Sequence, residues 1–203
     1  MNDEQIAARE AEVLGAPPRV RPLAPEELSP EVAELAREIG NVLGIPEPED
    51  LAIWFKIMAH HPGLYRRHLE VGIELLGRGA LPPVERELAI MRTGWLCGAP
   101  YEWSEHVAIA RKLGVDAATI ERVIVGSAAP GWSEHERALI RAVEELLADK
   151  MIGDATWEVL ARSWNERQLI ELPTLVGQYV AVAMMQNSLR LPLSHDRHGL
   201  RQR

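Results

Sequence analysis

The chain has 203 residues and a formal net charge of −8, with 47% hydrophobic and 26% charged residues. The acidic balance, without any basic block, argues against nucleic-acid binding, and no apolar run approaches the roughly 20 residues that span a bilayer. The single cysteine, Cys97, excludes an internal disulfide and a two-thiol redox centre within one chain. We expect one compact domain without a membrane partner and, because the N-terminus shows no export signal, a cytoplasmic location.

Apolar residues recur at helical spacing between Pro, Gly and Asp, and no stretch alternates as a strand would. The sequence therefore predicts an all-α, single-domain helical bundle. Residues 1–25 are expected to form an N-terminal extension, 26–193 the helical domain and 194–203 a frayed C-terminal tail. The predicted helices cover residues 30–44, 46–60, 63–77, 82–98, 100–114, 116–126, 133–149, 154–163 and 166–189.

The tetrapeptide WSEH occurs twice, at residues 103–106 and 132–135. In the second copy Ser133 begins a capping box at a helix start, which is a local structural role. The first copy is preceded by Glu102, four residues before His106, so both side chains can lie on one face of a helix. That face is otherwise apolar. Only the first copy therefore predicts a carboxylate and a histidine in buried surroundings.

The helix predicted before it supplies a second acid. On its helical wheel Glu87 points inward and Glu85 outward, and Gly94 lies on the side of Glu87, where a ligand or another backbone can approach. A carboxylate and an imidazole in an apolar pocket suit proton transfer near neutral pH, so we interpret Glu87 and His106 as a candidate active site. The alternatives are a satisfied core histidine, a glutamate paired with a neighbouring arginine, and, for Glu102, a charge that complements the helix dipole.

The remaining candidates have ordinary structural interpretations as well. Tyr101 and Trp103 are typical packing residues, and Cys97 is typical of a small buried hydrophobe. No two histidines have a convincing metal-ligand spacing, so we expect neither a metal nor a cofactor.

Residues 81–114, LPPVERELAIMRTGWLCGAPYEWSEHVAIARKLG, resemble the carboxymuconolactone decarboxylase family, which includes the alkylhydroperoxidase D-like proteins. The resemblance is carried by the ERELAIMR helix, the YEWxxH element and the following KLG, and it extends over most of residues 45–190. It implies an all-helical protomer of the alkylhydroperoxidase D-like type. It also implies assembly into homotrimers or homohexamers, with active sites near the protomer contacts.

The departures from the family pattern favour one of its branches. In the peroxidase-like branch a CxxC pair precedes the histidine by seven and four residues, and a glutamate precedes it by nineteen. Here His106 and Glu87 match the histidine and glutamate, but Ala99 and Glu102 occupy the cysteine positions. Cys97 comes two residues too early, and peroxidase chemistry through it alone would require an exposed thiol with a lowered pKa.

The resemblance therefore implies the decarboxylase-like branch, which needs no thiol. We expect cofactor-independent decarboxylation or proton transfer on a small carboxylated lactone or enolisable acid, with His106 as proton donor and Glu87 setting its tautomer and charge. The alternatives are a peroxidase that uses Cys97 and a catalytically silent, ligand-binding helical oligomer. The expected substrate-binding residues are Tyr101, Glu102, Trp103, Arg92 and Cys97.

Overall fold

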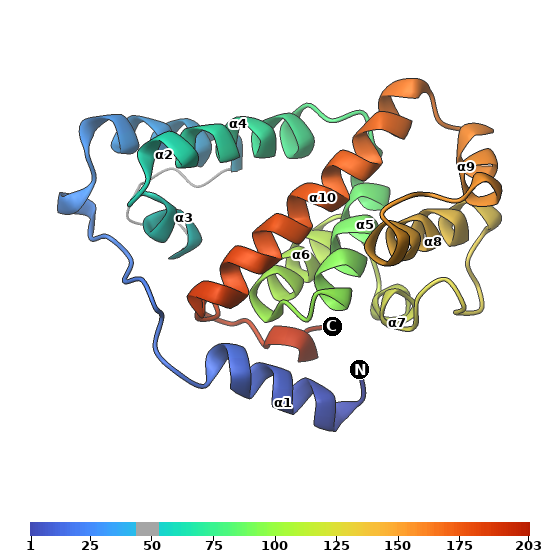
Figure 1. Ribbon diagram of the computed structural model, residues 1–203, viewed down its shortest axis with the longest axis horizontal. Coiled ribbons are helices and arrows are strands. Elements are labelled where there is room, and N and C mark those ends of the chain that lie inside the picture. The colour runs from blue at the N-terminus through green and yellow to red at the C-terminus, as the bar shows by residue number, and fades with distance from the viewer. Residues whose placement is uncertain (44–52) are drawn as a thin grey trace.

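The structure is a computed structural model that describes residues 1–43 and 53–203, and within these residues it contains helices and no strand (Figure 1). The all-α prediction is confirmed. The α-helices are α1 (Asp3–Leu14), α2 (Pro30–Leu43), α3 (Ile53–Met58), α4 (Pro62–Gly77), α5 (Pro83–Leu96), α6 (Pro100–Lys112), α7 (Ala117–Val125), α8 (Glu134–Asp149), α9 (Asp154–Ala161) and α10 (Glu166–Leu189), with the 3₁₀ turns η1 (Pro25–Glu27) and η3 (Gly199–Arg201).

The helix boundaries follow the local signals in the sequence. Pro83 and Pro100 begin α5 and α6, where a missing amide costs nothing. The Ser133 side chain accepts from the amide of Glu136, and the Glu136 side chain caps Ser133 in return, so the predicted capping box is present. The start of the helix predicted over residues 46–60 lies outside the described residues. Its described part is α3.

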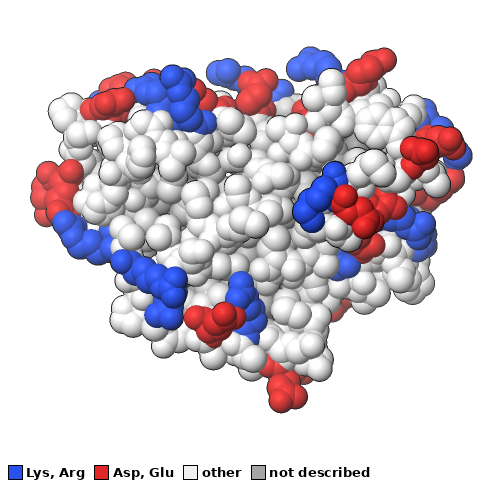
Figure 2. All heavy atoms as spheres, in the orientation of Figure 1, with Lys and Arg blue, Asp and Glu red and all other residues white. Residues whose placement is uncertain are grey.

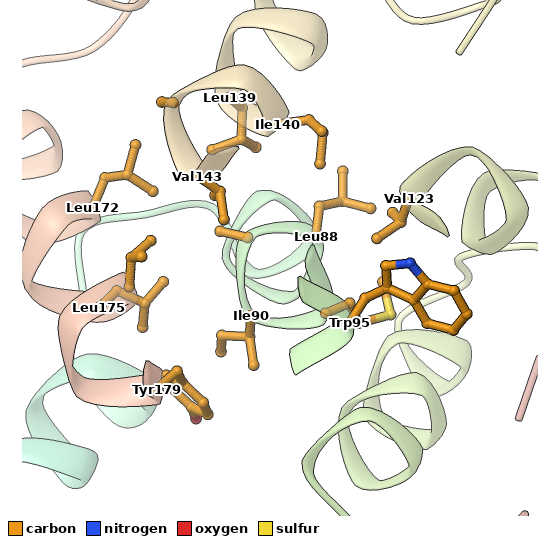
Figure 3. Close-up of a cluster of buried hydrophobic side chains, with 14 of the residues drawn as sticks. Leu88, Ile90, Trp95, Val123, Leu139, Ile140, Val143, Leu172, Leu175 and Tyr179 are labelled. Carbon is orange, nitrogen blue, oxygen red and sulfur yellow. The ribbon is translucent and has the colours of Figure 1, made fainter. Parts of the chain in front are cut away.

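Helix α5 lies at the centre of the larger hydrophobic cluster and packs against α6, α8 and α10. Figure 3 shows side chains of α8 and α10 meeting those of α5 from different sides. Because neighbours surround it, α5 is buried over most of its length. Residues of this cluster include Leu88, Ile90, Trp95, Val123, Leu139, Ile140, Val143, Leu172 and Leu175.

A second, smaller cluster joins α2, α3 and α4 to one side of α6 and α10. Helix α6 contributes to both clusters, since Trp103 packs in the larger one and Tyr101 in the smaller one. Helix α10 does the same with Tyr179 and Val182. These two helices therefore form the boundary between the clusters, which is where the candidate site lies.

The two ends of the chain lie together beneath the bundle (Figure 1). Helix α1 packs against η3, and Leu200 is fully buried, with its amide donating to Glu10 Oε1 at 2.8 Å. The expectation that residues 194–203 fray is therefore wrong. A polar composition predicted exposure, but Leu200 and the contacts to α1 hold this segment on the domain. Across the described residues, no helix combines the length and apolarity that a bilayer crossing requires.

Candidate active site

The packing of α5 against α6 brings Glu87 and His106 together. Glu87 Oε2 lies 2.7 Å from His106 Nδ1, a short hydrogen bond typical of charged partners. Glu87 is completely buried and His106 is 8% exposed. The two residues that the sequence selected as an acid–imidazole pair are thus in direct contact, in a site largely shielded from water.

Arg86 supports this pair from the other side of the carboxylate. Its Nε donates to Glu87 Oε1 at 3.1 Å, and its Nη1 donates to the Leu76 carbonyl at 3.0 Å. Burial raises the pKa of Glu87, but the charge and hydrogen bond of His106, together with the Arg86 guanidinium, lower it further than burial raises it. Glu87 is therefore ionised and can only accept, so His106 Nδ1 carries the proton and Nε2 is left for a substrate.

His106 borders a cavity of about 380 Å³ that α3, α4, α6 and α10 enclose. Its walls are mainly apolar and aromatic, which is typical of small-molecule sites. Tyr179 meets the His106 ring edge-on, with 4.9 Å between ring centroids, and so fixes the plane of the imidazole. Other wall residues are Trp54, Leu69, Ile73, Tyr101 and Val182.

A second imidazole borders the cavity opposite α6. His68 Nδ1 lies 3.0 Å from Gln178 Nε2, and Trp54 packs edge-on against the ring. Burial lowers the pKa of His68, so it is neutral at neutral pH. Because Gln178 Nε2 can only donate, His68 Nδ1 accepts and the proton is on Nε2.

Glu102 borders the cavity, in the buried surroundings that the sequence predicted. It is 1% exposed, and neither of its carboxyl oxygens has a hydrogen-bond partner among the described residues. Burial raises the pKa of Glu102 well above its ordinary value, so the group is a neutral acid at neutral pH. It does not bond to His106, whose Nδ1 is taken by Glu87. Gly94 lies directly behind it, since a Cβ there would sit 3.3 Å from Glu102 Oε1.

The two aromatic candidates have different positions. Tyr101 lines the cavity, and burial raises the pKa of its hydroxyl to about 12, so it is neutral and able to donate. Trp103 does not line the cavity. It packs against Trp95 with 5.0 Å between ring centroids, and its Nε1 donates to the Gln202 carbonyl at 3.1 Å. Its position is that of a core residue, the alternative considered for it from the sequence.

Arg92 lies away from the cavity, so the geometry does not support its expected contact with substrate. Its guanidinium is buried and donates to the Val123 and Ile124 carbonyls at 2.9 and 2.8 Å. It also donates to Glu144 Oε1 at 2.7 Å. Arg92 thus binds the free carbonyls at the end of α7, as cationic side chains commonly do at helix C-termini.

Cys97 also lies outside the cavity lining, at the C-terminal end of α5. Burial raises the pKa of its thiol to about 11. The thiol is therefore protonated at neutral pH, which is the opposite of what a peroxidatic cysteine needs. Among the residues that the structure describes, no group of three or more His, Cys, Asp or Glu side chains is placed to hold a metal ion.

Six polar residues of the cavity were not expected from the sequence: His68, Glu105, Lys112, Gln178, Gln186 and Arg197. Gln186 could have been found, because it follows Tyr179 by seven residues on a long helix and so shares its face. Arg197 belongs to the segment expected to fray, where no periodic pattern assigns a side chain to the site. Its place depends on the contacts between the two ends of the chain.

Comparisons with known proteins show what the chain resembles. The model of the carboxymuconolactone decarboxylase family matches residues 62–145, the segment from α4 into α8 that contains Glu87 and His106, which confirms the resemblance. The fold is that of the alkylhydroperoxidase D-like helical proteins. No curated protein matches this sequence.

Solved structures show the same fold at low sequence identity. An uncharacterised peroxidase-related protein with an alkylhydroperoxidase AhpD core, from Ralstonia eutropha JMP134, has a TM-score of 0.73 at 18% identity, over 89% of this chain and 95% of its own. An uncharacterised peroxidase-related protein from Silicibacter sp. TM1040 has a TM-score of 0.73 at 17% identity, and the match covers 90% of this chain and 96% of that protein. A cysteine-to-alanine variant of the debrominase Bmp8, in complex with 2,3,4-tribromopyrrole, has a TM-score of 0.72 at 17% identity. The match covers 87% of this chain and 92% of that protein.

Proposed function

We propose that the protein is a cofactor-independent, carboxymuconolactone decarboxylase-like enzyme that moves a proton to or from carbon on a small carboxylated lactone or related enolisable acid. The observation that carries this proposal is the buried hydrogen bond between Glu87 and His106, which leaves Nε2 for a mainly apolar cavity. The family match over residues 62–145 supports the class of enzyme.

In the decarboxylation form of the reaction, the bond between the ring carbon and the carboxylate breaks and carbon dioxide leaves. The electron pair stays on the substrate as an enolate that the lactone carbonyl delocalises. The His106 imidazolium then gives its Nε2 proton to carbon, becomes neutral and regains a proton from solvent. Ionised Glu87 accepts from Nδ1 and so keeps the remaining proton there after the transfer.

Glu102 supplies the second function that this chemistry requires. As a neutral acid without a partner, its hydroxyl can donate to the oxygen on which negative charge develops. A carboxyl kept protonated by apolar surroundings serves this purpose in other proton-transfer enzymes. A neutral acid also avoids the repulsion that an ionised carboxylate would exert on an anionic substrate.

The test is incubation with a panel of carboxylated butenolides and keto acids, while carbon dioxide release and deuterium incorporation at carbon are followed. We expect His106→Gln and Glu87→Gln each to lower turnover about a hundredfold or more, and Cys97→Ala to leave it within about twofold. Full activity in His106→Gln would exclude the mechanism. Hydroperoxide consumption that disappears in Cys97→Ala would instead identify a peroxidase. Saturable binding without turnover would identify a ligand-binding protein.

We also propose that the protomers assemble as homotrimers or homohexamers. Figure 2 shows a broad uncharged area in the middle of the visible face, over α10, with charged side chains along the upper edge and in groups to the right and below. Ile170 and Met184 of α10 are 67% and 64% exposed, which is unusual for large apolar side chains on a free surface. Light scattering coupled to size exclusion measures the assembly directly.

A further inference from the structure

The cavity has its own balance of charges, separate from the Glu87–His106 pair. Two cationic side chains border it, Arg197 and Lys112, together with the acids Glu105 and Glu102. Glu102 is neutral, and Lys112 has no ion-pair partner within the described residues. Formal charges of two cations against one carboxylate leave an excess of one positive charge, which suits a ligand with one negative charge.

Arg197 has hydrogen-bonding capacity that the protein does not use. Its Nη2 lies 3.3 Å from Glu105 Oε2, a long contact between side chains that are each about one quarter exposed. Arg197 Nε and Glu105 Oε1 are both buried without a partner. A guanidinium presents its donors as a fork that matches the two oxygens of a carboxylate. The weak contact to Glu105 therefore leaves Arg197 available to a second carboxylate.

The position of this guanidinium relative to His106 follows from the geometry of α6. Tyr101, Glu105 and Lys112 follow one another at spacings of four and seven residues and so form one row along the helix. Glu102 and His106 form the adjacent row. Both rows border the same cavity. A ligand anchored beside Glu105 therefore extends across a single helix face to reach His106, which limits it to a small molecule.

Buried polar groups without a partner continue along the wall. Gln186 is 4% exposed and its Oε1 has no hydrogen-bond partner among the described residues, like the carboxyl of Glu102. Leaving such groups unsatisfied costs about 1–3 kcal/mol each. Their gathering around one cavity indicates a polar ligand that satisfies them when it binds.

We propose that Arg197, assisted by Lys112, binds the carboxylate of a small ring-containing monocarboxylate whose reacting carbon then faces His106. This inference rests on the proposed function for the identity of the reacting group, and it adds the residue that selects acids over neutral molecules of the same shape.

The two ends of the chain hold Arg197 in place. Beyond it, Leu200 is buried against α1, and Trp103 Nε1 holds the Gln202 carbonyl. Arg201 contacts Asp3 and Glu10 of α1 at 3.5 and 3.7 Å. Arg197 is thus a specificity residue on a segment outside the family-matched region, residues 62–145. Proteins that share the matched region can therefore differ at this position.

The test compares benzoate with benzamide, two ring compounds of the same shape that differ in charge, by isothermal titration calorimetry on the full chain. We expect the wild type to bind benzoate roughly tenfold or more tightly than benzamide, which is the strength of a charge-assisted hydrogen bond. Arg197→Gln should remove this preference and leave benzamide affinity unchanged. Arg111→Gln is the matched control, since it removes an exposed arginine of α6 that does not border the cavity, and it should keep the preference.

Glu105→Gln should change the affinity for benzoate in the opposite direction from Arg197→Gln. It removes the carboxylate that competes for Arg197, so we expect benzoate to bind more tightly. Failure of benzoate to bind at millimolar concentrations, or a preference that survives Arg197→Gln, would overturn the proposal. The two proposals fail separately. A preference for benzoate that Arg197→Gln removes supports this inference even where no compound of the substrate panel is turned over, and turnover in a wild type that shows no such preference overturns this inference and leaves the proposed function standing.

Discussion

Helix α5 offers two glutamates, and each meets the histidine of one WSEH copy. Glu87 meets His106 of the first copy at 2.7 Å, and Glu85 meets His135 of the second at 3.3 Å. The first pair has side chains that are 0% and 10% exposed, whereas both side chains of the second are 24% exposed. The same residue types thus give two different environments within one fold.

The difference lies in what surrounds each pair. The inner pair is supported by Arg86 and opens onto a cavity, so one ring nitrogen is free for a ligand. In the outer pair both nitrogens of His135 are used, by Glu85 and by the hydroxyl of Ser163 at 3.0 Å. The outer pair therefore joins α5 to α8 and to the segment between α9 and α10, while the inner pair leaves one ring nitrogen unused.

Removing the two glutamates should produce the largest contrast in stability. Glu87→Ala leaves Arg86 and His106 buried without their partner, and we expect a loss of about 3–5 kcal/mol in the free energy of unfolding. Glu85→Ala leaves Trp164 Nε1 without its acceptor at a half-exposed site, and we expect a loss of about 1–2 kcal/mol. Urea unfolding followed by tryptophan fluorescence measures both.

The two variants lie two residues apart on one helix and share the same change in helix propensity, so each controls for the other. Glu87→Gln, which keeps the side-chain volume, separates lost charge from lost packing. Equal losses in the two alanine variants would show that burial does not distinguish the pairs.

The position four residues before each histidine sharpens the comparison, since it holds Glu102 in the first copy and Gly131 in the second. Burial raises the pKa of Glu102 in the folded protein above its ordinary value of 4.5, so above that pH the folded state binds more protons than the unfolded state. The contribution of Glu102 to the free energy of unfolding is therefore fully present below pH 4.5. It is lost as the pH rises through the pKa that Glu102 has in the folded protein. Glu102→Gln removes this loss.

We therefore expect the stability of Glu102→Gln relative to wild type to increase by roughly 1–2 kcal/mol from about pH 5 to about pH 8. Urea unfolding across this range measures the change. The exposed acid of Glu158→Gln on α9 serves as the control, with no change expected in its relative stability. Parallel profiles for Glu102→Gln and wild type would mean that Glu102 is ionised in the fold, which would remove its role as donor.

The inner pair could be predicted from the sequence because two local signals coincide there. The helical period places Glu87 and His106 on apolar faces, and the spacing of nineteen residues is part of the family pattern. Arg86 was foreseen only as a possible neighbour. Arg197 could not be predicted, since its place depends on a contact between Glu10 and Leu200, which are 190 residues apart. The predicted contact of Arg92 with substrate fails for the same reason, because carbonyls of α7, a helix distant in the sequence, determine the orientation of its side chain.

The smallest expected effect is that of His135→Gln, and it tests whether the outer pair is purely structural. Glutamine keeps a polar side chain next to Glu85 and Ser163, while Trp164 Nε1 still donates to Glu85, so we expect a loss of less than about 1 kcal/mol in the free energy of unfolding, as for a half-exposed ion pair. Turnover should stay within about twofold of wild type, because no nitrogen of this ring reaches the cavity. A drop comparable to that of His106→Gln would mean that both WSEH copies take part in catalysis.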